Sequence, residues 1–121
     1  MTSYEDILGP AYTARTLELP PDDEGELVAT LVSRRTPNPT GRAVLYVHGF
    51  VDYFFQTHLA DYWINAGYDF YALDLRKYGR SLRPHQTPNY IDNLESYDEE
   101  LNQAAHIIKT EDNHDTLVVM G

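Results

Sequence analysis

In this 121-residue sequence, the stretch AVLYVHGF, residues 43–50, says most about the fold. Its first five residues, 43–47, form a continuous apolar run, which is typical of a strand covered on both faces in a parallel sheet. Two more runs end in the same abrupt way: 70–73 leads into Asp74, and 117–120 leads into Gly121. The three runs predict three buried strands, each of which ends at a polar residue or a glycine.

The segments between these runs have the spacing of amphipathic helices. After the first run, apolar residues recur at i, i+4, i+7 and i+11, which places them on one helical face: Phe55, Leu59, Tyr62 and Ala66. Gly67 follows at the position typical of a glycine that ends a helix. After the polar loop 76–93, the pattern Ser96-x-x-Glu99 matches a capping box. Helical spacing then returns at Tyr97, Leu101, Ala104 and Ile108.

The first third of the chain predicts a β-hairpin. Residues 13–19 and 27–35 have the pattern of strands, and the breaker-rich segment 20–25 joins them as an antiparallel pair. From residue 42 onward the order is strand, helix, strand, helix, strand. Such alternation predicts an α/β fold with a parallel sheet and right-handed crossovers.

Composition argues against several classes of function. The formal charge of -10 opposes binding to nucleic acid and to anionic membrane surfaces. The absence of cysteine excludes disulfides, thiolate metal sites and a cysteine nucleophile within this chain. The N-terminus has no pattern of a secretory signal, and no apolar stretch approaches the ~18 residues that span a bilayer. We therefore expect a cytoplasmic protein with no nucleic-acid partner and no membrane insertion.

The loop DLRKYGRS at 74–81 resembles the Asp-x-Arg-Gly-x-Gly-x-Ser loop of the α/β-hydrolase superfamily, with Lys77 in place of the first glycine. Together with the His48-Gly49 pair and Gly121, this loop makes the chain similar to the N-terminal half of an α/β-hydrolase. Within the superfamily, the chain looks most like the serine aminopeptidase and monoacylglycerol-lipase-like branch.

The resemblance implies a partial α/β-hydrolase fold with the strand order 1-2-4-3-5, in which the second strand is antiparallel to the others. The chain would form the N-terminal part of one domain over residues 1–121. Its parts would be an N-terminal extension at 1–12, the hairpin at 13–35 and a βαβαβ unit at 42–121.

The resemblance also implies a site at the strand ends. The oxyanion loop would comprise His48, Gly49, Phe50 and Val51, with the Phe50 backbone N–H as one donor to the oxyanion. Side chains that would contact an apolar part of the substrate are Phe50, Tyr53 and Phe54, whereas ordinary packing is favoured for Phe55. A structural loop would include Asp74, Arg76, Gly79 and Ser81, with Asp74 paired to Arg76 and Ser81 hydrogen-bonded to the turn.

Gly121 would be the first glycine of the Gly-x-Ser-x-Gly elbow that carries the nucleophile. The implied function is hydrolysis of carboxylic ester or amide bonds by a serine just after Gly121. No triad residue would lie in this chain, which alone would be inactive and would need the C-terminal half of the same protein as its partner. An aspartate in the elbow would instead indicate an epoxide hydrolase or dehalogenase, and a non-catalytic binding module is a further alternative.

No cofactor is expected, because the sequence contains neither Gly-x-Gly-x-x-Gly nor a phosphate-binding P-loop. A metal is not expected either. The nearest group of oxygen and nitrogen ligands has irregular spacing across a loop and includes no His-Glu-x-x-His. Its members are His48, Asp52, His58 and Asp61.

Overall fold

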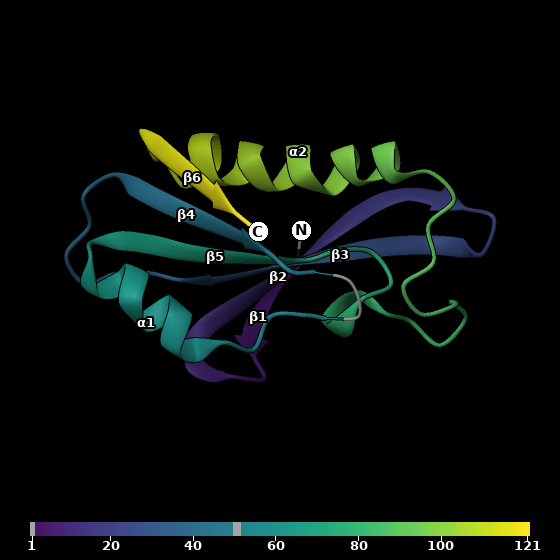
Figure 1. Cartoon of the computed structure of the whole chain (residues 1–121), viewed down its shortest axis with the longest axis horizontal. Helices are drawn as coiled ribbons and strands as arrows, with labels where there is room; N and C mark the ends of the chain where they lie inside the picture. Colours follow the sequence, from purple (N-terminus) through teal and green to yellow (C-terminus); the bar gives the residue numbers. More distant parts are fainter. Residues whose placement is uncertain (1, 50–51) are drawn as a thin grey trace.

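Six strands form one mixed sheet in the computed structural model, which describes residues 2–49 and 52–121 (Figure 1). The strand order across the sheet is β1-β2-β3-β5-β4-β6. The strands are β1 (Thr2–Asp6), β2 (Gly9–Asp22), β3 (Gly25–Arg34), β4 (Arg42–Val47), β5 (Tyr68–Asp74) and β6 (Thr116–Met120).

The predicted strand order is confirmed. Strands β2 to β6 correspond to the five expected strands and follow the order 1-2-4-3-5. Strand β3 is antiparallel to both β2 and β5, whereas β4 is parallel to β5 and to β6. The N-terminal twelve residues, expected as an extension, contain the additional strand β1, which pairs with β2. Its short polar sequence, TSYED, carries no run of apolar residues that would indicate a strand.

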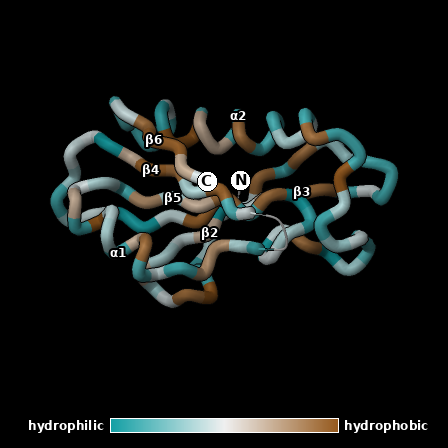
Figure 2. The backbone as a smooth tube through the Cα atoms, in the orientation of Figure 1, coloured by the Kyte–Doolittle hydropathy of each residue, from teal (hydrophilic) through white to brown (hydrophobic). Residues whose placement is uncertain are grey.

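Helices cover both faces of the sheet (Figure 1). Helix α1 (Thr57–Asn65) packs on one face, where its Ala60 and Ile64 meet Phe70 of β5. Helix α2 (Asp98–His106) continues into a π-helical turn, Ile107–Glu111, on the other face. Two separate hydrophobic clusters therefore line the sheet, one beneath each helix. Figure 2 shows the hydrophobic residues along the central strands and the hydrophilic ones gathered in the connecting loops.

The buried face of α1 differs from the predicted one. Its fully or nearly fully buried residues are Ala60 and Ile64, whereas Tyr62 is 67% exposed. Phe55, for which packing was favoured, precedes the helix and is 52% exposed. The buried face is offset by about one residue from the predicted one: Ala60, Trp63 and Ile64 pack beside Leu59, whereas Tyr62 and Ala66 are exposed. Gly67 does end the helix, with φ of 86° and its N–H donating to the Ile64 carbonyl at 3.0 Å.

Helix α2 has the predicted face but a different beginning. Ala104 and Ile108 are fully buried, and Tyr97 and Leu101 pack against the same cluster. The predicted capping box at Ser96 and Glu99 does not form the start of the helix. A 3₁₀ turn, Leu94–Tyr97, leads into it instead, and the Asn93 side chain caps that turn by accepting from the Glu95 N–H at 3.0 Å.

Candidate active site

The ends of β4 and β6 lie side by side at one edge of the sheet. These strands pair in parallel register from Arg42 with Thr116 to Tyr46 with Met120. One residue further along, a Cβ placed on Gly121 would lie 3.9 Å from the Val47 carbonyl oxygen. The His48-Gly49 pair and the last residue of the chain are therefore brought to the same edge, as the sequence predicted.

His48 fixes the backbone that leaves β4. Its Nε2 accepts a hydrogen bond from the Leu75 N–H at 3.0 Å, so this nitrogen carries no proton. Its Nδ1 lies 2.8 Å from the Gly49 carbonyl oxygen, to which it donates. The ring is thus held as the neutral Nδ1–H tautomer between the ends of β4 and β5. These contacts give His48 a structural role and place it 6% exposed behind the loop.

The predicted oxyanion residues Phe50 and Val51 lie outside the described residues, so the Phe50 N–H remains a prediction. The chain on either side is defined. A Cβ added to Gly49 would meet no atom of the described residues within 4 Å, which leaves open space at this point of the loop.

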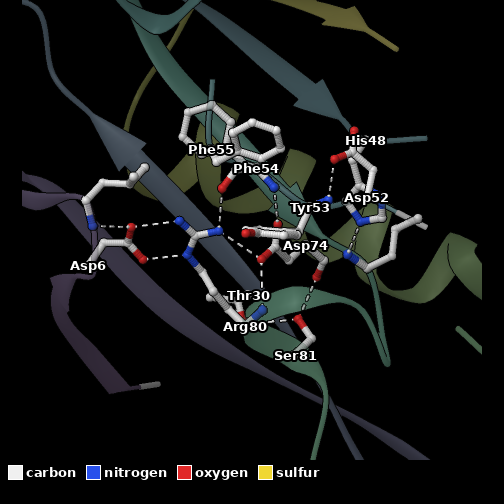
Figure 3. Close-up of polar contacts among 12 residues, drawn as sticks. Asp6, Thr30, His48, Asp52, Tyr53, Phe54, Phe55, Asp74, Arg80 and Ser81 are labelled. Carbon is white, nitrogen blue, oxygen red and sulfur yellow. Dashed lines mark hydrogen bonds and ion pairs between the residues drawn. The ribbon is translucent and has the colours of Figure 1, made fainter. Parts of the chain in front are cut away.

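Asp74, at the end of β5, anchors the chain that follows the predicted oxyanion residues (Figure 3). Its Oδ1 accepts from the Phe54 N–H at 2.9 Å, and its Oδ2 accepts from the Arg80 N–H and Nη1, each at 3.0 Å. Arg80 Nη1 also donates to the Phe54 carbonyl oxygen at 2.8 Å. Both backbone groups of Phe54 are therefore held by one buried ion pair.

Asp6 completes this network from the loop end of β1 (Figure 3). Its two carboxylate oxygens accept from Arg80 Nε at 2.6 Å and Nη2 at 2.8 Å. Burial alone would raise the pKa of Asp6, but the hydrogen bonds from Arg80 and from the Leu8 N–H outweigh it and lower the pKa. The sequence analysis missed both Asp6 and Arg80, because 74 residues separate them and no local pattern joins them.

The predicted pair of Asp74 and Arg76 does not form. Arg76 instead meets the fully buried Glu100 of α2, with Nη2 2.7 Å from Oε1 and the backbone N–H 3.0 Å from Oε2. The chain turns after Leu75, where the Tyr78 N–H donates to the Leu75 carbonyl. This turn directs Arg76 to the α2 face, whereas Asp74 faces the segment that precedes α1.

Gly79 and Ser81 both have local structural reasons for their identity. Gly79 has φ of 42°, and a Cβ there would lie 2.5 Å from the Tyr53 Cβ and 2.8 Å from Asp74 Oδ2. The Ser81 hydroxyl donates to the Asp74 carbonyl oxygen at 2.7 Å and lies 3.1 Å from the Thr30 hydroxyl. The predicted hydrogen bond of Ser81 to the turn is therefore confirmed.

The aromatic residues after the oxyanion loop divide into two groups. Phe54 is fully buried, with its ring 5.2 Å from that of Phe70 and 6.2 Å from that of Tyr46, so its side chain lies in the core. Tyr53 and Phe55 are exposed and contact one another, with ring centroids 5.4 Å apart. Of Tyr53 and Phe54, the two described residues expected to contact a substrate, only Tyr53 reaches the surface.

The described surface includes a small pocket and a larger groove. A small pocket of about 270 Å³ lies beside His48 and Gly49. A larger groove of about 530 Å³ runs between β2 and α2, but none of its lining residues comes from the ends of β4, β5 or β6. The smaller pocket is therefore the one that adjoins the ends of β4 and β5.

No three His, Asp or Glu side chains in residues 2–49 and 52–121 are grouped so as to hold a metal ion. The helices of that same part of the chain are too short or too polar to cross a membrane.

This chain is similar to a known protein family and to several solved structures. The family model described as "Serine aminopeptidase, S33" matches residues 38–121. Among solved structures, DcsB in complex with its substrate analogue has 19% identity and a TM-score of 0.62, covering 88% of this chain and 36% of that chain. An epoxide hydrolase from an endophytic Streptomyces has 28% identity and a TM-score of 0.54, covering 88% and 28% respectively.

A third solved structure, an alpha-beta serine hydrolase homologue from Coxiella burnetii, has 12% identity and a TM-score of 0.57, covering 88% of this chain and 51% of that chain. This chain thus spans about half the length of the matched structures or less. Comparison with curated proteins gives no match.

Proposed function

The chain belongs to the serine aminopeptidase S33 family, and on that premise we propose that it forms part of a hydrolase of carboxylic ester or amide bonds. The observation that carries the proposal is the parallel, in-register pairing of β4 with β6. This pairing brings the end of β4 and Gly121 to the same edge of the sheet, which supports a donor after His48 and a nucleophile after Gly121 acting together. A backbone donor and a nucleophile supplied from these two points would approach one carbonyl group from neighbouring strands.

The proposed reaction is acyl transfer through a serine nucleophile. The serine, in an elbow that begins at Gly121, attacks the carbonyl carbon, and a histidine base outside this chain takes its proton. The Phe50 N–H and an elbow N–H stabilise the developing oxyanion. Contacts of the described residues support this scheme: His48 is hydrogen-bonded just before the predicted oxyanion residues, and Asp74 with Arg80 holds the backbone of Phe54 just after them.

Covalent labelling tests the proposal. The full-length protein should hydrolyse p-nitrophenyl acetate and react with a fluorophosphonate, and peptide mapping should place the label on a serine within the few residues after Gly121. Residues 1–121 alone serve as the control and should stay unlabelled. A label on Ser3, Ser33, Ser81 or Ser96, or an active protein that takes no label, would contradict a serine nucleophile at this point.

One observation supports a second candidate reaction. The structure with 28% identity is an epoxide hydrolase, and an aspartate in the elbow would attack an epoxide carbon in place of a carbonyl. The full-length protein would then hydrolyse styrene oxide, and the fluorophosphonate would not label it. Inactivity toward both substrate types would favour a non-catalytic binding module.

A further inference from the structure

The pocket beside the catalytic edge has an inner wall and an outer wall. The inner wall is formed by the ends of β4 and β5, through His48, Gly49 and Leu75. The outer wall is formed by the loop that leads to α2, through Asn89, Ile91 and Leu94. Its volume of about 270 Å³ exceeds the roughly 150 Å³ of an apolar protein cavity known to hold benzene. A short alkyl chain therefore fits.

The outer wall is attached to the rest of the fold through Lys77. The Lys77 side chain is fully buried, and its Nζ forms ion pairs with Asp22 and with Glu24, the latter at 2.6 Å. These two carboxylates belong to the turn between β2 and β3. The same Nζ lies 4.5 Å from the centre of the Tyr90 ring. The Lys77 carbonyl also accepts from the Asn89 N–H at 3.0 Å.

Glu24 strengthens this attachment from the other side. It accepts from the Thr87 N–H at 3.0 Å as well as from the Thr87 hydroxyl. The hydrogen bond from Lys77 has the largest effect on Glu24, and together with the two from Thr87 it lowers the pKa of Glu24 to about 2. Lys77 and Glu24 therefore remain oppositely charged at neutral pH, and the turn before β3 is tied to the loop that forms the outer wall.

The backbone of Lys77 is unusual for a lysine. Its φ is 63°, in the left-handed region that favours glycine. Glycine would adopt this conformation without strain, but it would lack the side chain that reaches Asp22, Glu24 and Tyr90. Lys77 therefore combines a strained backbone with contacts that only its side chain can make. Strained backbone of this kind is often found at functional sites.

We infer that this pocket binds a short alkyl chain on the acyl side of the substrate, and that Lys77 is a positioning residue that holds the outer wall of the pocket in place. The inference deepens the proposed function and rests on it for the identity of the reaction. Lys77 makes no contact with the reacting atoms in this scheme. It acts through Asn89 and Tyr90, which carry the wall residues Ile91 and Leu94.

A substrate series in the full-length protein tests the pocket. Ile91→Trp, which fills the pocket, should raise KM for p-nitrophenyl hexanoate about tenfold more than it raises KM for p-nitrophenyl acetate. Lys77→Met should raise KM for the hexanoate by about fivefold, with kcat for the acetate nearly unchanged. Lys109→Met, which alters the only other lysine in residues 1–121, is the matched control and should change neither value.

Equal effects of Ile91→Trp on the two esters would overturn the pocket, and this variant decides the question even if Lys77→Met fails to fold. A Lys77→Met protein that folds and keeps the wild-type KM for the hexanoate would overturn the positioning role.

Lysine acetylation provides a readout that needs no catalysis. In the full-length protein, an amine-reactive acetylating reagent should modify Lys77 at least tenfold more slowly than the exposed Lys109, because Lys77 reacts only when the wall opens. Hexanamide, used as a probe at saturating concentration, should slow Lys77 acetylation by a further factor of about five and leave Lys109 unaffected.

The two experiments separate the two proposals. Protection of Lys77 by hexanamide in a protein without esterase activity would retain the pocket and contradict the proposed reaction. Esterase activity without protection would retain the reaction and overturn the pocket.

Discussion

Gly79 shows how a single residue supports the geometry of the site. Its positive φ and its close approach to Tyr53 and Asp74 both exclude a larger side chain. We predict that Gly79→Ala destabilises the full-length protein by about 3 kcal/mol, from left-handed backbone strain and from displacement of Tyr53. Gly9→Ala is the matched control, because Gly9 also has a positive φ but a Cβ there meets open space.

Urea unfolding measures both variants. The control should lose only the backbone component, about 1–2 kcal/mol. Equal losses for Gly79→Ala and Gly9→Ala would show that the contact with Tyr53 and Asp74 has no energetic weight.

The sequence predicted site residues where a local motif carried them, and failed where the partner was distant. Gly79 and Ser81 follow from the loop motif, and each has the expected local role. The loop motif suggested Arg76 as the partner of Asp74. In the structure, Asp74 pairs with Arg80, and Arg76 pairs with Glu100. Which arginine meets which carboxylate depends on the turn after Leu75, and pattern spacing does not specify the direction of that turn.

The network of Asp6, Arg80 and Asp74 works at the level of the elements, because it joins the end of β1, the end of β5 and the segment before α1 (Figure 3). We predict that Asp74→Asn destabilises the full-length protein by about 3 kcal/mol, since it leaves part of the Arg80 charge buried without compensation. The same substitution also weakens the hold on Phe54 and should lower esterase kcat.

Asp61→Asn is the control for this prediction, because the same chemical change then affects the surface pair of Asp61 with Arg34. Asp61 is 56% exposed in its side chain, and its loss should cost about 0.5 kcal/mol or less. Chemical denaturation of both variants would settle the comparison. A cost for Asp74→Asn no greater than for Asp61→Asn would mean that the buried network does not anchor the loop.

The positions of the helices and strands along the chain were easier to predict than the residues that each of them buries. The apolar runs of β4 and β5 identify buried strands, because both of their faces are covered. The run of β6 also forms a strand, but the prediction that this strand is buried was wrong: β6 lies at the edge of the sheet, and Val119 is 61% exposed. The predicted face of helix α1 included Tyr62 and, just before the helix, Phe55. Both side chains are exposed, because they have helical spacing but lie on a different face from the buried residues. Strand β1 was missed because its pairing with β2, rather than its own composition, makes it a strand.

At the scale of the whole molecule, several carboxylates should make stability depend on pH. Burial alone would raise the pKa of Asp6 and of Asp112, but hydrogen bonds from Arg80 and Arg15 respectively outweigh it, so both pKa values are lowered. The pKa of Glu24 falls from 4.5 to about 2. In this range the unfolded chain binds protons that the folded chain does not, so stability decreases as the pH falls.

We therefore predict a steep loss of stability in the full-length protein between pH 4.5 and pH 2, measured by urea midpoints at several pH values. Glu24→Gln should make the decline shallower in this window, because it removes one of the groups with a lowered pKa. An unchanged slope in that variant would contradict the assignment of Glu24 to the charged pair with Lys77.

The proposed function depends on the meeting of β4 and β6 at one edge of the sheet, where a donor and a nucleophile would act on the same carbonyl group. The most direct measurement is a crystal structure of the full-length protein after reaction with a fluorophosphonate. The account predicts phosphorus bonded to a serine just after Gly121, with the phosphoryl oxygen about 3 Å from the Phe50 amide nitrogen. A bond to a serine elsewhere, or an oxygen beyond about 5 Å from that nitrogen, would contradict it.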